Sequence, residues 1–163
     1  MPFSQPLPTI TSLYNNAVVI LAVNSTTIER VIAAPIVIGA NTLGLNDSLL
    51  FTVNYRYIVS GLSAPVFRIR LGGLTGTQLF IDTASATENV LGKVLFQNRN
   101  AANVNFNSTS AIYDTGAAST LDIAQLSVDT TQSLAVVMTA SFSTADSLST
   151  IKINSINIQS IRA

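Results

Sequence analysis

Cysteine, histidine and tryptophan are all missing from the 163 residues of this chain. Without cysteine the chain forms no disulfide and offers no thiol nucleophile, and without histidine it lacks the commonest metal ligand. No remaining side chain has an ordinary pKa near neutrality, so catalysis would depend on tuned carboxylates, a lysine or a metal held by oxygen atoms. We therefore expect no enzymatic activity, no metal and no cofactor.

Charged residues are scarce as well. Eight basic and eight acidic residues cancel and make up 10% of the chain, whereas 48% is hydrophobic and 50 residues are serine, threonine or asparagine. Disorder is excluded, because it needs low hydrophobicity and high net charge. Nucleic-acid binding is not expected, because no excess of cations is available to neutralise phosphates. A mean hydropathy of +0.46 with so little charge predicts an oligomer, and we expect a homotrimer.

Long apolar segments are absent. The longest, Ala17–Val23 and Val31–Ile38, hold seven and eight residues, far fewer than the ~20 that a transmembrane helix needs. Residues 1–8 contain three prolines and no basic residue, unlike a secretory signal. We expect a soluble chain with no membrane insertion.

What the sequence does contain is apolar residues at every second position, the pattern of half-buried strands. In Leu49–Val59, Tyr55 and Tyr57 share the apolar side, and Arg56 falls on the other. In Thr150–Ile161 the alternation slips by one residue, which predicts a β-bulge near Asn154-Ser155. The other predicted strands are Val66–Leu71, Thr77–Thr83, Val90–Gln97, Val104–Phe106, Ala111–Asp114, Leu121–Val128 and Ser133–Phe142.

Turn-forming residues separate these runs at intervals of roughly 8–12 residues, a spacing typical of antiparallel sandwiches and barrels. Gly72-Gly73 predicts a hairpin between two of the runs. Ala117–Leu126 also fits a short helix, and that alternative stays open. We predict an all-β fold, an antiparallel jelly roll or β-sandwich of about 8–10 strands, as a single domain over residues 17–163.

Residues 1–16 differ from the rest, because three prolines interrupt any regular sheet pairing there. We predict an extended, proline-rich N-terminal arm. Phe3, Leu7 and Ile10 would bury themselves against a partner, so they are candidate partner-binding residues. The alternative is a frayed terminus.

Three arginines form the second candidate surface. Alternation predicts that Arg56, Arg68 and Arg70 share the outer face of adjoining strands, with Asp82 as their nearest acid. Arginine beside amide side chains can donate to carboxylates or to sugar hydroxyls. The alternative is a face that meets only solvent. If the register of Tyr55 and Tyr57 slipped by one residue, these tyrosines would instead form a lectin-like platform.

Three segments are similar to parts of known proteins. Gly39–Leu49 contains an Asn-x-Leu-Gly-x-Asn-Asp-x-Leu turn that opens a strand, Phe67–Gly73 is a strand ending in two glycines, and Lys93–Asn100 follows later. Together they resemble a β-rich module of small virion proteins, and of the ends of fibre proteins, in tailed bacteriophages. The resemblance covers about residues 36–161. It implies a trimeric jelly roll on a capsid or tail, and it carries over no catalytic residue.

These observations lead to two functional hypotheses. The first is a structural virion protein, a trimeric capsid decoration (cement) protein that clamps neighbouring major capsid subunits. The second is a receptor- or carbohydrate-binding tip domain of a phage tail or head fibre, whose partner would be a host surface glycan. Both place the protein on the virion, at the capsid or tail surface, after synthesis in the host cytoplasm.

Overall fold

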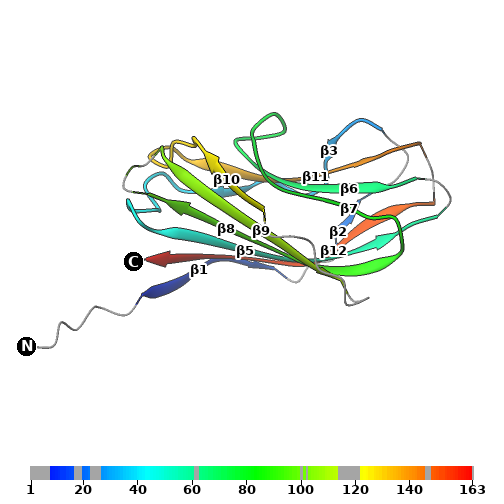
Figure 1. Cartoon of the computed structure of the whole chain (residues 1–163), viewed down its shortest axis with the longest axis horizontal. Helices are drawn as coiled ribbons and strands as arrows, with labels where there is room; N and C mark the ends of the chain where they lie inside the picture. The colour runs from blue at the N-terminus through cyan, green and yellow to red at the C-terminus, as the bar shows by residue number, and fades with distance from the viewer. Residues whose placement is uncertain are drawn as a thin grey trace, which may run out of the picture.

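The structure of the chain is a computed structural model that describes residues 8–16, 20–22, 27–60, 63–99, 101, 103–113, 122–145 and 148–162. Within these ranges there are twelve strands and no helix (Figure 1). The predicted all-β fold is therefore confirmed. No helix in the described part of the chain is long and apolar enough to span a membrane.

The strands form two antiparallel sheets that pack face to face (Figure 1). The larger sheet has the order β1-β12-β5-β8-β9-β10, and β2 also pairs with β12. Its strands are β1 (Thr9–Asn16), β2 (Ile20–Ala22), β5 (Ser48–Ile58), β8 (Glu88–Asn98), β9 (Asn105–Tyr113), β10 (Asp122–Leu126) and β12 (Thr150–Arg162). The smaller sheet has the order β3-β11-β6-β7, and β4 also pairs with β11. Its strands are β3 (Arg30–Val31), β4 (Ile36–Ile38), β6 (Pro65–Leu71), β7 (Thr77–Thr83) and β11 (Leu134–Phe142).

The pairing is nested, as in a long hairpin that has been rolled up. The first strands, β1 and β2, pair with the last, β12; β4 pairs with β11, β5 with β8, and β6 with β7, all antiparallel. This nesting over two sheets is the topology of a jelly roll. Strands β9 and β10 extend the larger sheet beyond β8.

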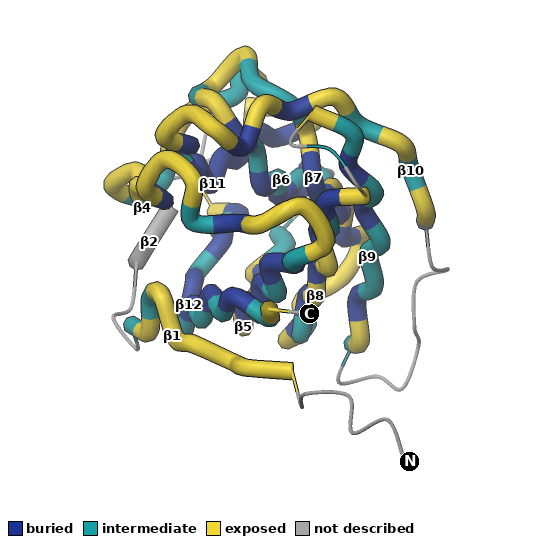
Figure 2. Tube along the Cα trace, turned by 90° about the vertical axis from the view of Figure 1, so that its left-hand side faces the viewer, coloured by how far each residue is buried: buried dark blue, intermediate teal, exposed yellow. Residues whose placement is uncertain are grey.

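The core lies between the sheets, where both present their apolar residues (Figure 2). Tyr55 and Tyr57 on β5 are fully buried, as the alternation predicted. The ring of Tyr55 packs 4.6 Å from that of Phe67 across the sandwich, centroid to centroid. At Gly92 an added Cβ would lie 3.1 Å from Phe80 and 3.2 Å from Tyr55, so a side chain there would require the two rings to shift by a few tenths of an ångström.

Two local predictions hold in detail. The pairing of β12 with β5 shifts register between Ile153 and Ser155, which is the predicted bulge. Gly72 and Gly73 follow β6 with φ angles of 89° and 102°, in the region that glycine adopts without strain, and the chain returns as β7.

The predicted N-terminal arm differs from the structure in its second half. Thr9–Asn16 is strand β1 and pairs with β12, because the residues after Pro8 keep the backbone N–H groups that a ladder needs. Most of β1 is exposed (Figure 2). The sequence of Ala117–Leu126 fits either a strand or a short helix, and within it Asp122–Leu126 forms strand β10. Most of the two runs predicted at Val104–Phe106 and Ala111–Asp114 belongs to the single strand β9, and Asp114 lies outside the described residues.

Candidate functional site

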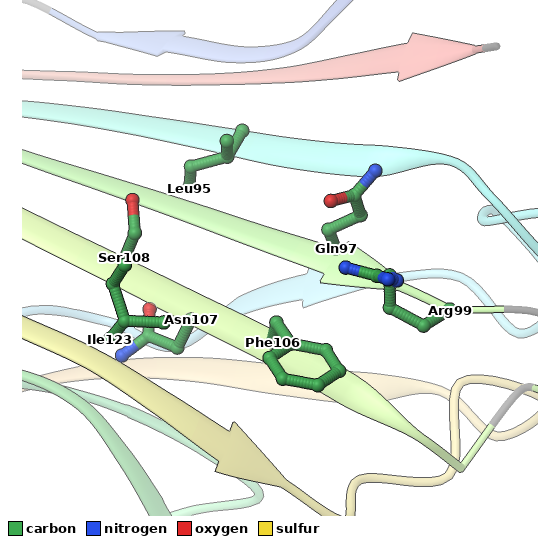
Figure 3. A pocket seen from close by; sticks show the side chains of 7 residues that line it. All are labelled: Leu95, Gln97, Arg99, Phe106, Asn107, Ser108 and Ile123. Carbon is green, nitrogen blue, oxygen red and sulfur yellow. The ribbon is translucent and has the colours of Figure 1, made fainter.

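A groove of about 180 Å³ lies on the outer face of the larger sheet, over β8, β9 and β10 (Figure 3). We call it the β8–β10 groove. Its walls follow from the alternation of β8, whose buried side chains are the even-numbered ones, such as Val94 and Phe96. The strand pairing sets Gln97 opposite Phe106 and Leu95 opposite Ser108. The lining residues are Leu95, Gln97, Arg99, Phe106, Asn107, Ser108 and Ile123.

The groove combines apolar walls with polar groups that have no partner among the described residues. The guanidinium carbon of Arg99 lies 5.0 Å from the centre of the Phe106 ring, a cation–π contact. Leu95 and Ile123 are 37% and 64% exposed. The side chains of Gln97 and Ser108 make no hydrogen bond to any described residue. The groove can therefore take a small ligand that has both an apolar face and hydroxyl groups.

Asn107 lines the same groove, but its side chain stabilises the contact between the two sheets. Its side chain is buried, and Nδ2 donates to the backbone carbonyl of Leu79 at 2.5 Å, which ties β9 to β7 of the other sheet. A second recess of about 220 Å³ involves the other end of β8 and is more open. It is lined by Asn54, Asn89, Val90, Leu91, Ile112 and Tyr113.

The three arginines do not lie together, and the prediction that they share one face is wrong. Arg56 is exposed on β5 of the larger sheet, whereas Arg68 and Arg70 lie on β6 of the smaller sheet. Strands β5 and β6 are consecutive in the chain but belong to opposite layers, so their outer faces point in opposite directions. Alternation identified the outer side of each strand correctly and could not identify the sheet.

Arg68 and Arg70 are held by an acid that we did not predict. Arg70 donates from Nε and Nη2 to the two carboxylate oxygens of Glu29 at 2.7 and 2.9 Å. The hydroxyl of Thr139 also donates to the carboxylate of Glu29. Nη1 of Arg68 lies 3.8 Å from Oε2 of Glu29 and donates a hydrogen bond to the hydroxyl of Ser141. The hydrogen bonds from Arg70 lower the pKa of the Glu29 carboxyl below its ordinary value. This cluster covers the outer face of β6 and β11, and both arginines are engaged within the fold.

Asp82, predicted to lie near the arginines, is instead buried between the sheets. Its Oδ2 accepts hydrogen bonds from the hydroxyls of Tyr55 and Tyr57 at 2.7 and 3.0 Å, and its Oδ1 accepts one from Tyr113 at 2.5 Å. Tyr57 also donates to the backbone carbonyl of Asp82 at 3.1 Å. Burial, above all, raises the pKa of each of the three phenols well above the ordinary value. We call these four residues the Asp82 cluster; it joins β7 to β5 and β9.

Of the predicted arm residues, Ile10 lies on β1 and is 61% exposed. Phe3 and Leu7 lie outside the described residues. No group of three or more acidic side chains able to hold a metal occurs in the part of the chain that the structure describes.

The residues of the β8–β10 groove were not singled out in the sequence. Gln97, Phe106 and Ser108 occupy the non-core positions of their strands, so alternation marks them as exposed and nothing more. The sequence does not show that β8 pairs with β9, and this pairing alone sets an aromatic ring beside an amide and a hydroxyl.

Comparison with known proteins yields structural likeness alone. No protein-family model matches the sequence, and no curated protein matches it. Among solved structures, a Lotus tetragonolobus seed lectin matches with a TM-score of 0.49 and 9% identity, over 98% of this chain and 96% of the lectin. Peanut lectin with a nine-residue peptide matches with a TM-score of 0.46 and 10% identity, over 100% of this chain and 95% of the lectin. Lectin I of Ulex europaeus, in complex with a methyl glycoside of α-L-fucose, matches with a TM-score of 0.43 and 10% identity. The match covers 96% of this chain and 92% of the lectin. Likenesses of this strength support no functional inference, and the fold assignment depends on the strand pairing of the chain itself.

Proposed function

We propose that this chain is a carbohydrate-binding domain displayed on the surface of a tailed-phage virion, at the tip of a tail or head fibre. The saccharide would occupy the β8–β10 groove. The jelly roll hosts both viral capsid and lectin domains, so the fold is compatible with this function without implying it. The virion location is supported by the sequence resemblance of the turn at Gly39–Leu49 and the strand at Phe67–Gly73.

The observation that carries the proposal is the composition of the groove. A sugar ring offers an apolar C–H face and a rim of hydroxyls, and the groove offers Phe106 and Leu95 beside the unpartnered polar groups of Gln97 and Ser108. Its volume of about 180 Å³ is below the range of ~300–1,000 Å³ for drug-sized ligands. The groove therefore fits one sugar ring, either of a free sugar or of one unit in a longer saccharide.

The test is a screen of the full chain against immobilised saccharides, repeated with Phe106→Ala. We expect binding by the native chain and about fivefold to thirtyfold weaker binding by the variant, because one buried aromatic contact contributes about 1–2 kcal/mol. Ile81→Ala is the matched control, because Ile81 is a 51% exposed apolar side chain on the smaller sheet. Failure to bind any saccharide, or equal weakening by both variants, would contradict the proposal.

A second candidate function is the trimeric decoration protein that clamps capsid subunits. Strand β1 favours it, because β1 is the edge of the larger sheet and no described strand pairs with its other side. It also exposes Ile10 and Leu13 at 61% and 37%. An exposed edge with apolar side chains is a ready site for another chain. Co-sedimentation with capsids tests this function, and Ile10→Asp should abolish it while leaving the melting temperature unchanged.

A further inference from the structure

Positive charge is concentrated on the outer face of the larger sheet. Arg56 on β5, Lys93 on β8 and Lys152 on β12 occupy the non-core positions of their strands, and Arg99 follows β8 at the groove. These are four of the eight basic residues in a chain of zero net charge. None of the four makes an ion pair with a residue that the structure describes.

The described acidic side chains lie elsewhere. Glu29 is engaged on the smaller sheet, and Asp82 is buried between the sheets. Asp47 and Asp129 lie in turns, where each accepts a backbone hydrogen bond. Glu88 lies opposite Tyr57 in the ladder between β8 and β5, at a position of β8 that faces inward. Among the side chains that the structure describes, the acids are therefore used within the fold, whereas the outer face of the larger sheet keeps its cations.

Two of these cations oppose each other directly. Arg56 and Lys152 are cross-strand partners on β5 and β12, and both are on the outer side. Side chains at such positions have Cβ atoms about 4.5–5.5 Å apart, and like charges there destabilise a sheet. An anion between the two side chains would remove that repulsion.

We propose that this face binds an acidic polysaccharide, one whose sugars carry carboxylate groups. The inference rests on the proposed function and specifies its ligand class. Asn89 lies opposite Arg56 on β8, and Lys93 is flanked by Thr52 and Ser110, so each cation is beside an amide or hydroxyl suited to a sugar. At a rise of about 3.4 Å per residue, Lys93 and Arg99 lie roughly 20 Å apart along β8. Cations spread along a strand suit a polymer rather than a single acidic sugar.

A single-stranded nucleic acid suits the face less well. Binding of that kind depends on exposed aromatic rings on which successive bases stack. On the outer face of the larger sheet, Phe106 is the one aromatic side chain among the described residues, and the guanidinium of Arg99 lies over its ring. The remaining neighbours of the cations are amides, hydroxyls and aliphatic side chains.

The test compares two forms of one polymer. An oligogalacturonate long enough to span the face is titrated into the full chain by calorimetry, and its methyl ester, which has the same sugars without the charges, is titrated in parallel. We expect the acid to bind about tenfold more tightly than the ester, and its affinity to fall as salt is raised. Arg56→Gln with Lys152→Gln, and separately Arg99→Gln, should weaken binding of the acid by about threefold to tenfold.

Arg30→Gln is the matched control, because Arg30 is an exposed arginine on β3 of the smaller sheet. It should leave binding unchanged. Equal affinity for acid and ester, with loss on Phe106→Ala, would overturn this inference and leave the proposed function intact. Binding of neither form, nor of any other saccharide, would overturn both. Tighter binding of an oligothymidylate of equal charge would overturn the inference in favour of a nucleic acid.

One further measurement needs no ligand. If Arg56 and Lys152 repel each other, Lys152→Gln should melt at a higher temperature than the native chain, and oligogalacturonate should raise the melting temperature of the native chain more than that of the variant. A lower melting temperature for Lys152→Gln, together with an equal response to the polymer, would show that the pair is not strained and does not meet the ligand.

Discussion

Removing the carboxylate of Asp82 should loosen the contact between the two sheets. The carboxylate accepts hydrogen bonds from Tyr55, Tyr57 and Tyr113, and Asp82 itself is 7% exposed. Hydrogen bonds to a charged group contribute about 1.5–3 kcal/mol each, and a buried donor left unpaired costs about 1–3 kcal/mol. In Asp82→Ala, the hydroxyl of Tyr55 loses the acceptor that the structure gives it.

The other two tyrosines lose less. Tyr57 keeps the backbone carbonyl of residue 82 as an acceptor at 3.1 Å, and Tyr113 is half-buried and can turn toward water. The sum for Asp82→Ala is therefore about 3–5 kcal/mol, which lowers the melting temperature of a domain this size by roughly 10 °C. Asp82→Asn keeps the side-chain volume and one acceptor oxygen, so it should cost about 1–2 kcal/mol.

Urea denaturation of the native chain and both variants, followed by tyrosine fluorescence, measures these differences. Asp129→Ala is the control, because Asp129 is exposed and caps a turn through Thr131. A loss below about 1 kcal/mol for Asp82→Ala, or equal losses for Ala and Asn, would refute the reasoning. The small loss would mean that aromatic packing alone holds β7 against β5, and equal losses would mean that the acceptor oxygen kept by asparagine contributes nothing.

Three further predictions concern the stability and the assembly of the chain. Burial raises the pKa of Tyr55 and Tyr57, so both phenols stay protonated in the folded chain after they ionise in the unfolded chain. The free energy of unfolding should therefore be unchanged below pH ~10 and fall above it by about 3 kcal/mol per pH unit, which urea denaturation between pH 9 and about 11 measures. Tyr57→Ala should lose about 3–5 kcal/mol while Arg56→Ala stays within about 0.5 kcal/mol; the reverse order in thermal melts would contradict the register. Light scattering should find an oligomer, which a stable monomer at micromolar concentration would disprove.

Much of the fold could be predicted because one face of nearly every strand is buried. Alternation with a period of two tells which side of a strand meets the core, and it placed Tyr55 and Tyr57 inward and the bulge beside Ser155. The glycines at 72 and 73 marked the turn between β6 and β7 through their backbone freedom. All of these properties are local, since each depends on residues adjacent in the chain.

The candidate site could not be predicted, because it depends on which strands become neighbours. The residues that line the β8–β10 groove look in sequence like any other exposed strand positions, and only the pairing of β8, β9 and β10 brings the ring of Phe106 beside Gln97 and Arg99. The sequence alone likewise assigns Glu29 no partner, although Arg70 is 41 residues away in the chain and 2.7 Å away in space.

Composition and periodicity by themselves thus determined that the chain is all-β, that it contains no cysteine or histidine, and which side of each strand is apolar. Tertiary structure decided the rest. It separated Arg56 from Arg68 and Arg70 by sending β5 and β6 to opposite sheets, and it buried Asp82 among three tyrosines. It also gathered on one face cations that form no ion pair with a described residue. The physical reason is that alternation records only whether a side chain is buried, whereas strand pairing is a non-local choice made by the packing of the whole sandwich.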